Sequence, residues 1–308
     1  MLYAKNVLGL VTIFLMIFSC LSYAQLPVTD GLALHLEPSG IVESEVEGVM
    51  HVTAWLDSSG NGYDAGPTPD PLELPVKIVD PMTGLDMVHF EDDGLLIPSD
   101  SNSLTPKTDG ITILVVANTD EATANQYYIQ KANTGSTVEG WSVNMVDRGR
   151  LGSRICGKGG TDDENRGWLY KYRGTTDRVI VTTIFYYDQG TNIGEVYAAV
   201  NGDDTGYLSN IWSELYYGNS NPDADVEIGN LFYGDIAEII IYDAELSQTE
   251  LESMYTYLSN KYYIDTPFST GCEAVWAAGE GEEADVNKDC LINIDDFVEM
   301  ANNWLLSY

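Results

Sequence analysis

The sequence predicts an all-β fold, a sandwich or a barrel, with one late helix. Strand-like runs recur between residues 25 and 265, and clusters of Gly, Asn, Asp and Pro separate them. The pattern does not alternate strands with helices, which disfavours a parallel sheet. Many short strands joined by such turns are typical of sandwiches and barrels.

The predicted strands alternate with recognisable turns. Turn sequences stand at residues 58–62, 92–94 and 201–204. In the last strand, strict alternation would place Ile236, Glu238 and Ile240 on one face and Ala237 and Ile239 on the other. That strand is apolar on much of both faces, as in a central strand of two packed sheets. The clearest strands are Leu32–Leu36, Met87–Phe90, Thr112–Ala117, Val179–Tyr187, Glu195–Val200 and Ala237–Tyr242.

One helix is signalled near the end of this region. Ser247 and Glu250 have the spacing of a capping box, in which each side chain bonds the other residue's backbone N–H. Apolar residues follow at helical spacing and predict a face that packs on the core. Residues 267–271 resemble a linker. The apolar positions are Leu251, Met254, Tyr255, Leu258 and Tyr262.

The first 24 residues have the features of a signal peptide. Lys5 precedes an uncharged, largely apolar run from Val7 to Leu21, and Ser22-Tyr23-Ala24 forms a small-residue cleavage site. We therefore predict an extracellular or cell-surface protein. Two alternatives are an uncleaved membrane anchor and lipidation at Cys20, because Ile17-Phe18-Ser19-Cys20 loosely resembles a lipobox.

The charge is strongly acidic. The chain of 308 residues has 48 Asp and Glu against 14 Lys and Arg, a formal net charge of −34. Removing residues 1–24 removes one Lys and no acid, so 13 basic and 48 acidic residues give −35. Such a surface repels phosphate backbones, which argues against nucleic acid as a partner, and it attracts cations. Solubility outside the cell explains most of this charge.

Residues 285–296 have the pattern of an EF-hand calcium loop. Calcium takes six to eight oxygen ligands, which such loops supply at positions 1, 3, 5, 7, 9 and 12. An apolar helical face follows at Phe297, Met300, Ala301, Trp304 and Leu305. The alternative is an acidic turn that binds no metal. The predicted ligands are Asp285, Asn287, Asp289, the carbonyl of Leu291, Asn293 and Asp296.

This loop resembles a dockerin repeat, which implies docking to a cohesin-like protein. Cys290 stands where such loops have glycine, and a second repeat is not evident. Because Cys272 and Cys290 flank a short stretch of one small unit of an exported chain, we predict a disulfide between them. In the chain-entropy account it contributes about 3 kcal/mol. Cys156 is then free or buried. We assign residues 271–308 to a small α-helical calcium-loop domain.

Residues 26–265 resemble the LamG-like, concanavalin A-like domains of secreted bacterial proteins. The likeness rests on the stretches 31–36, 52–62 and 234–243, the last running into Leu246-Ser247. It implies a two-sheet jelly-roll sandwich that binds carbohydrate or protein, sometimes through calcium. It does not imply one function.

Alternating aromatic residues are the candidate sugar-binding residues. Trp168, Tyr170 and Tyr172 would share one face of a strand, where rings can stack on the apolar faces of sugars. The alternative is that these rings pack in the sandwich core, which the polar Lys171 and Arg173 on the opposite face favour.

Catalytic patterns are weak. Glu43, Glu45 and Glu47 alternate, and a retaining glycosidase needs two carboxyls about 5 Å apart, but we interpret these residues as a solvated acidic loop. Residues 152–158 match the first part of a P-loop, but Gly159 stands where Ser or Thr is needed, so we predict a glycine-rich loop. His35, His51 and His89 are interpreted as structural.

The sequence thus predicts an exported, non-catalytic protein that binds a polysaccharide or another glycan and has a calcium-stabilised tail. A structural or adhesion protein that binds another surface protein is the first alternative. A glycoside hydrolase with an unrecognised site is the second.

Overall fold

The computed structural model describes most of the predicted β region and a few residues of the tail. Among the described residues, no helix is both long and apolar enough to cross a membrane. The signal peptide and residues 270–283 lie outside the described part. The described residues are 25–68, 74–98, 104, 109–120, 126–132, 140–146, 150–156, 166–172, 178–188, 193–209, 224–269, 284, 286, 294, 296–298, 300 and 301.

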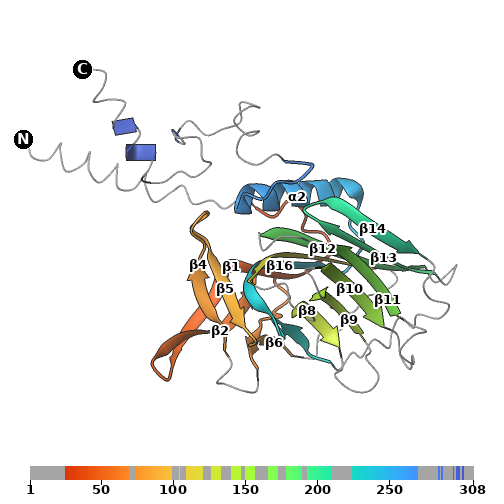
Figure 1. Ribbon diagram of the computed structural model, residues 1–308, viewed down its shortest axis with the longest axis horizontal. Coiled ribbons are helices and arrows are strands. Elements are labelled where there is room, and N and C mark those ends of the chain that lie inside the picture. The colour runs from red at the N-terminus through yellow and green to blue at the C-terminus, as the bar shows by residue number, and fades with distance from the viewer. Residues whose placement is uncertain are drawn as a thin grey trace, which may run out of the picture.

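Two antiparallel sheets face each other and form a β-sandwich, as the sequence predicts (Figure 1). In the described part of the chain the larger sheet has nine strands. β5 (Asp86–Glu91) pairs with both β16 (Tyr233–Tyr242) and β4 (Val76–Val79). The main path is β14 (Asp203–Ser209), β13 (Ile193–Val200), β12 (Val179–Asp188), β7 (Ile111–Thr119), β16 (Tyr233–Tyr242), β1 (Leu32–Val46) and β2 (Val49–Asp57).

The smaller sheet has seven strands among the described residues. Its four long strands lie between residues 126 and 172 and pair as consecutive hairpins, and its short strands come from elsewhere in the chain. The order is β11 (Arg166–Tyr172), β10 (Arg150–Cys156), β9 (Gly140–Val146), β8 (Gln126–Ala132), β15 (Val226–Ile228), β6 (Leu95–Ile97) and β3 (Gly66–Pro67).

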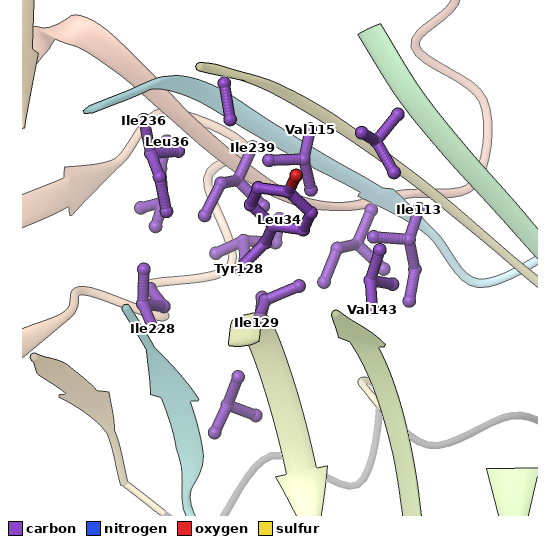
Figure 2. Packing of buried hydrophobic residues seen from close by; sticks show 14 of the residues in the cluster. Leu34, Leu36, Ile113, Val115, Tyr128, Ile129, Val143, Ile228, Ile236 and Ile239 are labelled. Atoms are coloured by element: carbon purple, nitrogen blue, oxygen red, sulfur yellow. The ribbon is translucent and has the colours of Figure 1, made fainter. Parts of the chain in front are cut away.

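The main core fills the space between the sheets. Figure 2 shows Leu34, Val115 and Ile239 from the larger sheet packed towards Tyr128 and Ile129 from the smaller one, and all five are buried. Fully burying one such side chain contributes about 1.5–3 kcal/mol. The period of two places Leu34 and Leu36 of β1, and Ile113 and Val115 of β7, on this inner face.

A second core lies under the helix α2 (Gln248–Tyr262) on the outer face of the larger sheet. The predicted capping box is present, because Ser247 and Glu250 bond each other's backbone N–H. The predicted apolar face is buried. Part of the predicted linker packs here too, since Phe268 stacks on Tyr255 with ring centroids 5.6 Å apart. The prediction that residues 267–271 form a linker was therefore wrong for Phe268, because its ring packs on the second core.

The central strand β16 departs from strict alternation. The register shifts between Ile236 and Glu238, so a bulge interrupts the strand at this point. Ile236, Ile239 and Ile241 share the inner core, while Ala237 and Ile240 pack under the helix. Our prediction that Ile236 and Ile240 share a face was wrong, because the bulge adds one residue and inverts the pattern.

The bulge leaves Glu238, fully buried, in contact with the helix. Its carboxylate lies 2.6 Å from His35 Nε2 and 2.8 Å from Lys261 Nζ, and the Tyr262 hydroxyl donates to it across 2.6 Å. Burial acts to raise the pKa of Glu238. The hydrogen bond from His35 and the charge of Lys261 outweigh burial and hold that pKa below its ordinary value.

Candidate functional site

The outer face of the seven-stranded sheet is polar. In register, Glu227 of β15 pairs with Gln130 of β8, which pairs with Ser142 of β9. Residues paired in register share a face of a sheet. In β9 these polar positions alternate with the core residues Trp141 and Val143. The row therefore points away from the sandwich core.

A second row runs beside the first. Asn144 of β9 pairs with Tyr127 of β8 and with Gly152 of β10. A Cβ at Gly152 would lie 2.8 Å from Asn144 Oδ1, closer than real Cβ contacts come. The absent side chain of Gly152 thus leaves room for the Asn144 amide. Residues 152–156 are strand rather than the glycine-rich loop that we predicted, and this contact gives the glycine a packing role.

Within the described part of the chain, two oxygens on this face have no hydrogen-bond partner. Ser142 Oγ and Asn144 Oδ1 are both buried and unpaired, and each residue is 2% exposed. Leaving a buried polar atom unpaired costs about 1–3 kcal/mol. Natural proteins pair most such atoms, so an exception needs a reason, such as a bound water or ligand. We name Gln130, Ser142, Asn144, Gly152 and Glu227 the polar face.

Glu227 stands where the polar face meets an open pocket. Its Oε2 accepts from Gln130 Nε2 across 2.5 Å and from Asn230 Nδ2 across 2.6 Å. These two donors fix the direction of the carboxylate. A carboxylate has about four lone-pair sites, so Glu227 keeps acceptor capacity for a further donor.

The pocket has a volume of about 550 Å³ and lies between the 92–94 turn and the 229–231 turn. Asp92 and Asp93 supply carboxylates, while Leu96 and Leu231 supply apolar surface. Burial raises the pKa of Asp93 to about 6. The full lining is Thr68, Asp92, Asp93, Gly94, Leu95, Leu96, Glu227, Ile228, Asn230 and Leu231.

Among the described residues, no three His, Cys, Asp or Glu side chains gather closely enough to hold a metal ion. The pocket and the polar face offer hydrogen-bonding groups beside an apolar strip. That combination is typical of small-molecule sites.

The predicted aromatic residues lie on the edge strand β11. The register pairs Trp168 with Arg154, Tyr170 with Gly152 and Tyr172 with Arg150. These positions continue the rows of the polar face, whereas Leu169 pairs with Ser153, which bonds Thr183 of the other sheet across 2.7 Å. The side chains of residues 166–172 lie outside the described part.

The acidic stretch at 43–47 is strand as far as Val46 rather than loop, while Glu47 lies in the turn to β2 and is exposed, as predicted. Glu43 and Glu45 lie in β1, which pairs with β2 up to Val46 and Val49. Glu43 lies 2.8 Å from Lys77 Nζ, which also lies 3.1 Å from Asp86. Pairing with β2 and this ion pair explain why acidic residues form a strand here.

The three histidines all bond neighbouring groups, as a structural role requires. His35 bonds Glu238 and Ser58, and His51 bonds the Leu74 carbonyl. His89 Nδ1 lies 2.7 Å from Asp235. Burial acts to lower the pKa of His89, but the hydrogen bond to Asp235 and that residue's charge outweigh burial and raise it.

The predicted calcium loop lies almost wholly outside the described residues. This applies to Asp285, Asn287, Asp289, Leu291 and Asn293, and to the predicted disulfide between Cys272 and Cys290. Asp296 is described: it is 2% exposed, and its Oδ1 accepts from the Val286 N–H across 2.7 Å. Residues 296–298, 300 and 301 are helical, where the sequence predicts a helix.

Sequence reasoning missed the polar face. A signal was present in residues 141–145, Trp-Ser-Val-Asn-Met, where large apolar residues alternate with small polar ones. That pattern predicts a strand with a polar outer face. It does not reveal that Gln130 and Glu227 join the same face, because register across distant strands decides this.

No protein-family model matches the chain, and no curated protein matches it in sequence. Solved structures resemble it in fold. Domain 4 of AbnA, a GH43 extracellular arabinanase from Geobacillus stearothermophilus in complex with arabinotriose, has 13% identity and a TM-score of 0.49. That match covers 73% of this chain and 98% of the domain.

Two further structures show a similar level of likeness. The botulinum neurotoxin serotype D binding domain has 12% identity and a TM-score of 0.49, and the match covers 74% of this chain. The chain spans 51% of that structure, about half its length. The CBM40 of Ruminococcus gnavus IT-sialidase has 17% identity and a TM-score of 0.40, covering 57% of this chain and 94% of the CBM40. Likenesses this distant do not identify a ligand.

Proposed function

We propose that this protein is an exported or cell-surface carbohydrate-binding protein that performs no catalysis. The observation behind the proposal is the polar face, where Ser142 Oγ and Asn144 Oδ1 are buried without described partners and where Glu227 also lines an open pocket. The LamG-like, concanavalin A-like jelly roll remains our proposal for the finer class of the sandwich.

Sugar hydroxyls both donate and accept hydrogen bonds, so they complement this set of groups. Ser142 Oγ and Asn144 Oδ1 can accept from them, and Glu227 can accept from a further hydroxyl. Leu96 and Leu231 offer apolar surface to the C–H face of a ring. A pocket of about 550 Å³ lies within the usual range for ligand sites.

The aromatic strand extends this proposal. Trp168 and Tyr170 occupy positions in the same rows as the polar face. An aromatic ring there would stack on a sugar, and stacking of this kind supplies affinity beyond area burial. A glycan that lies across β8 to β11 would then contact the polar groups of β8 and β9 and the aromatic rings of β11.

The test is a glycan array probed with the full mature chain, in calcium and in chelator. We expect binding to a defined set of glycans, weakened by Asn144→Ala and unchanged by Ser253→Ala on α2. The absence of binding in both conditions would refute the proposal. Sugar release from any bound polysaccharide would overturn its non-catalytic part.

We also propose that the tail binds calcium and that the metal holds the unit together. Among the predicted ligands, Asp296 has a buried carboxylate that bonds the backbone of residue 286 at the start of the loop. This bond joins positions 2 and 12 of the loop, and so fits a closed calcium loop. Attachment to a cohesin-like or other surface protein is the further role that we propose for this unit.

A protein partner is the second candidate, and exposed apolar side chains on the β1–β2 hairpin favour it. Val49 and Met50 are 52% and 50% exposed, and Val42 and Leu56 are also exposed. An adhesion role predicts binding that survives on glycan-free partners and is lost in Met50→Ser. The glycan array and a binding assay on deglycosylated surface protein separate the two candidates.

A further inference from the structure

Glu227 stands at the entrance to the polar face from the pocket. It lies in register with Gln130 on one side and with Leu96 on the other, and it lines the pocket. It is half-buried. A ligand unit that enters through the pocket and reaches Gln130 must therefore pass beside this carboxylate.

Among the described residues, no cationic side chain bonds Glu227. Its two described donors are the neutral amides of Gln130 and Asn230. The other ionisable groups that line the pocket are Asp92 and Asp93, and the described lining contains no Lys, Arg or His. The whole chain has a net charge of −34. A ligand carboxylate placed here would meet like charges in a partly desolvated site.

Basic positions exist on the same face, but farther along it. Arg150 and Arg154 lie on β10, three strands from β15 in the order β10, β9, β8, β15. At about 4.8 Å per strand, that distance is roughly 14 Å. By their place in the sheet, Arg150 and Arg154 therefore stand apart from the pocket end of the polar face.

We infer that Glu227 determines specificity on this face, so that the sugar unit beside it is uncharged and units with a carboxylate are rejected. This inference rests on the proposed function, and it narrows the ligand to neutral glycans at the pocket end. The physical reason is that specificity comes from placing a like charge against the wrong ligand as much as from contacts to the right one. A neutral sugar instead donates a hydroxyl hydrogen bond to the carboxylate.

The probes are matched pairs that differ at C6 alone, such as β-1,4-linked mannan oligosaccharides against β-1,4-linked oligomannuronates and cello-oligosaccharides against β-1,4-linked oligoglucuronates. For a pair that binds, we expect the full mature chain to prefer the neutral member by about tenfold or more. Glu227→Gln keeps an amide oxygen for Asn230 and removes the charge. We expect this variant to bind the acidic member at least about threefold tighter than the parent does.

Glu252→Gln on α2 is the control, because it makes the same change of net charge away from the pocket. We expect it to leave the ratio between neutral and acidic probes unchanged. Raising salt from about 0.05 M to about 0.5 M should reduce the preference for the neutral probe more in the parent than in Glu227→Gln, which keeps only Asp92 and Asp93 as pocket charges.

A preference of the parent for uronates, or an unchanged ratio in Glu227→Gln, would overturn the inference and leave carbohydrate binding intact. The absence of binding to every glycan, neutral or acidic, would overturn the proposed function and this inference together.

Discussion

Lys261 of α2 donates to the fully buried carboxylate of Glu238 across 2.8 Å and so links the helix to the central strand β16. His35 of β1 reaches the other oxygen of the same carboxylate across 2.6 Å. A buried charge is tolerated when it is paired and hydrogen-bonded. This cluster therefore stabilises the attachment of the helix to the sheet only while every member is present.

Replacing Lys261 with Met should destabilise the fold by about 3–5 kcal/mol, because it leaves Glu238 charged and buried without its cation. The measurement is urea denaturation followed by circular dichroism. Lys77→Met is the control, since its ion pairs are partly exposed and should contribute about 0–1 kcal/mol. Equal losses in the two variants would contradict a special role for the buried pair.

Acid should weaken the fold through Glu238. The pKa of this carboxyl is lowered in the folded protein, so its contribution is present above the unfolded pKa of about 4.3. That contribution is lost as pH falls through the lower folded value. We expect the unfolding free energy to drop below about pH 4, and to drop less in Glu238→Gln. Denaturation curves measured between pH 3 and pH 7 test this, and parallel curves for the two proteins would count against it.

Asp93 should lower the stability of the fold as pH rises, the opposite of the effect of Glu238. Its pKa is raised to about 6 by burial, so the folded state is penalised as the carboxyl ionises between pH 4 and pH 6. Asp93→Asn is therefore expected to raise stability at neutral pH by about 1 kcal/mol, a small value because the group is partly exposed to solvent. Thermal unfolding at pH 4 and pH 7.5 checks this prediction. A rise in the stability of Asp93→Asn at pH 4 but not at pH 7.5 would refute it.

The unpaired oxygens of the polar face allow a test that separates binding from folding. Ser142→Ala removes a buried hydroxyl that has no described partner, so we expect unchanged or slightly raised stability. If sugar hydroxyls pair with Ser142 in the complex, the same change weakens glycan binding by about tenfold. Paired measurements of Tm and Kd decide, and a loss of stability together with binding would point to a purely structural serine.

Gly152→Ala provides a second test of that face. The new Cβ would lie 2.8 Å from Asn144 Oδ1 and force the amide to move. We expect binding to weaken at least as much as in Asn144→Ala, with the fold retained. Gly66→Ala is the control, because a Cβ there meets nothing within 4 Å. Normal binding by Gly152→Ala would remove Asn144 from the site.

Calcium removal tests the tail. If residues 285–296 form a calcium loop, chelation should unfold the tail while the sandwich keeps its own transition, because metal binding there is coupled to folding. Asp296→Ala should reproduce the effect without chelator. Differential scanning calorimetry with and without calcium measures it. Identical traces would contradict a metal-stabilised tail.

The sequence by itself determined six strands of the larger sheet, the capped helix α2 and the central position of β16. These features depend on periods of two and 3.6 and on local capping, which neighbouring residues set. Tertiary structure alone decided the bulge at Ala237, the pairing of Glu238 with Lys261, and the meeting of Ser142, Gln130 and Glu227 on one face. Register between strands far apart in the chain sets these contacts, and a shift of one residue would turn each side chain to the other face.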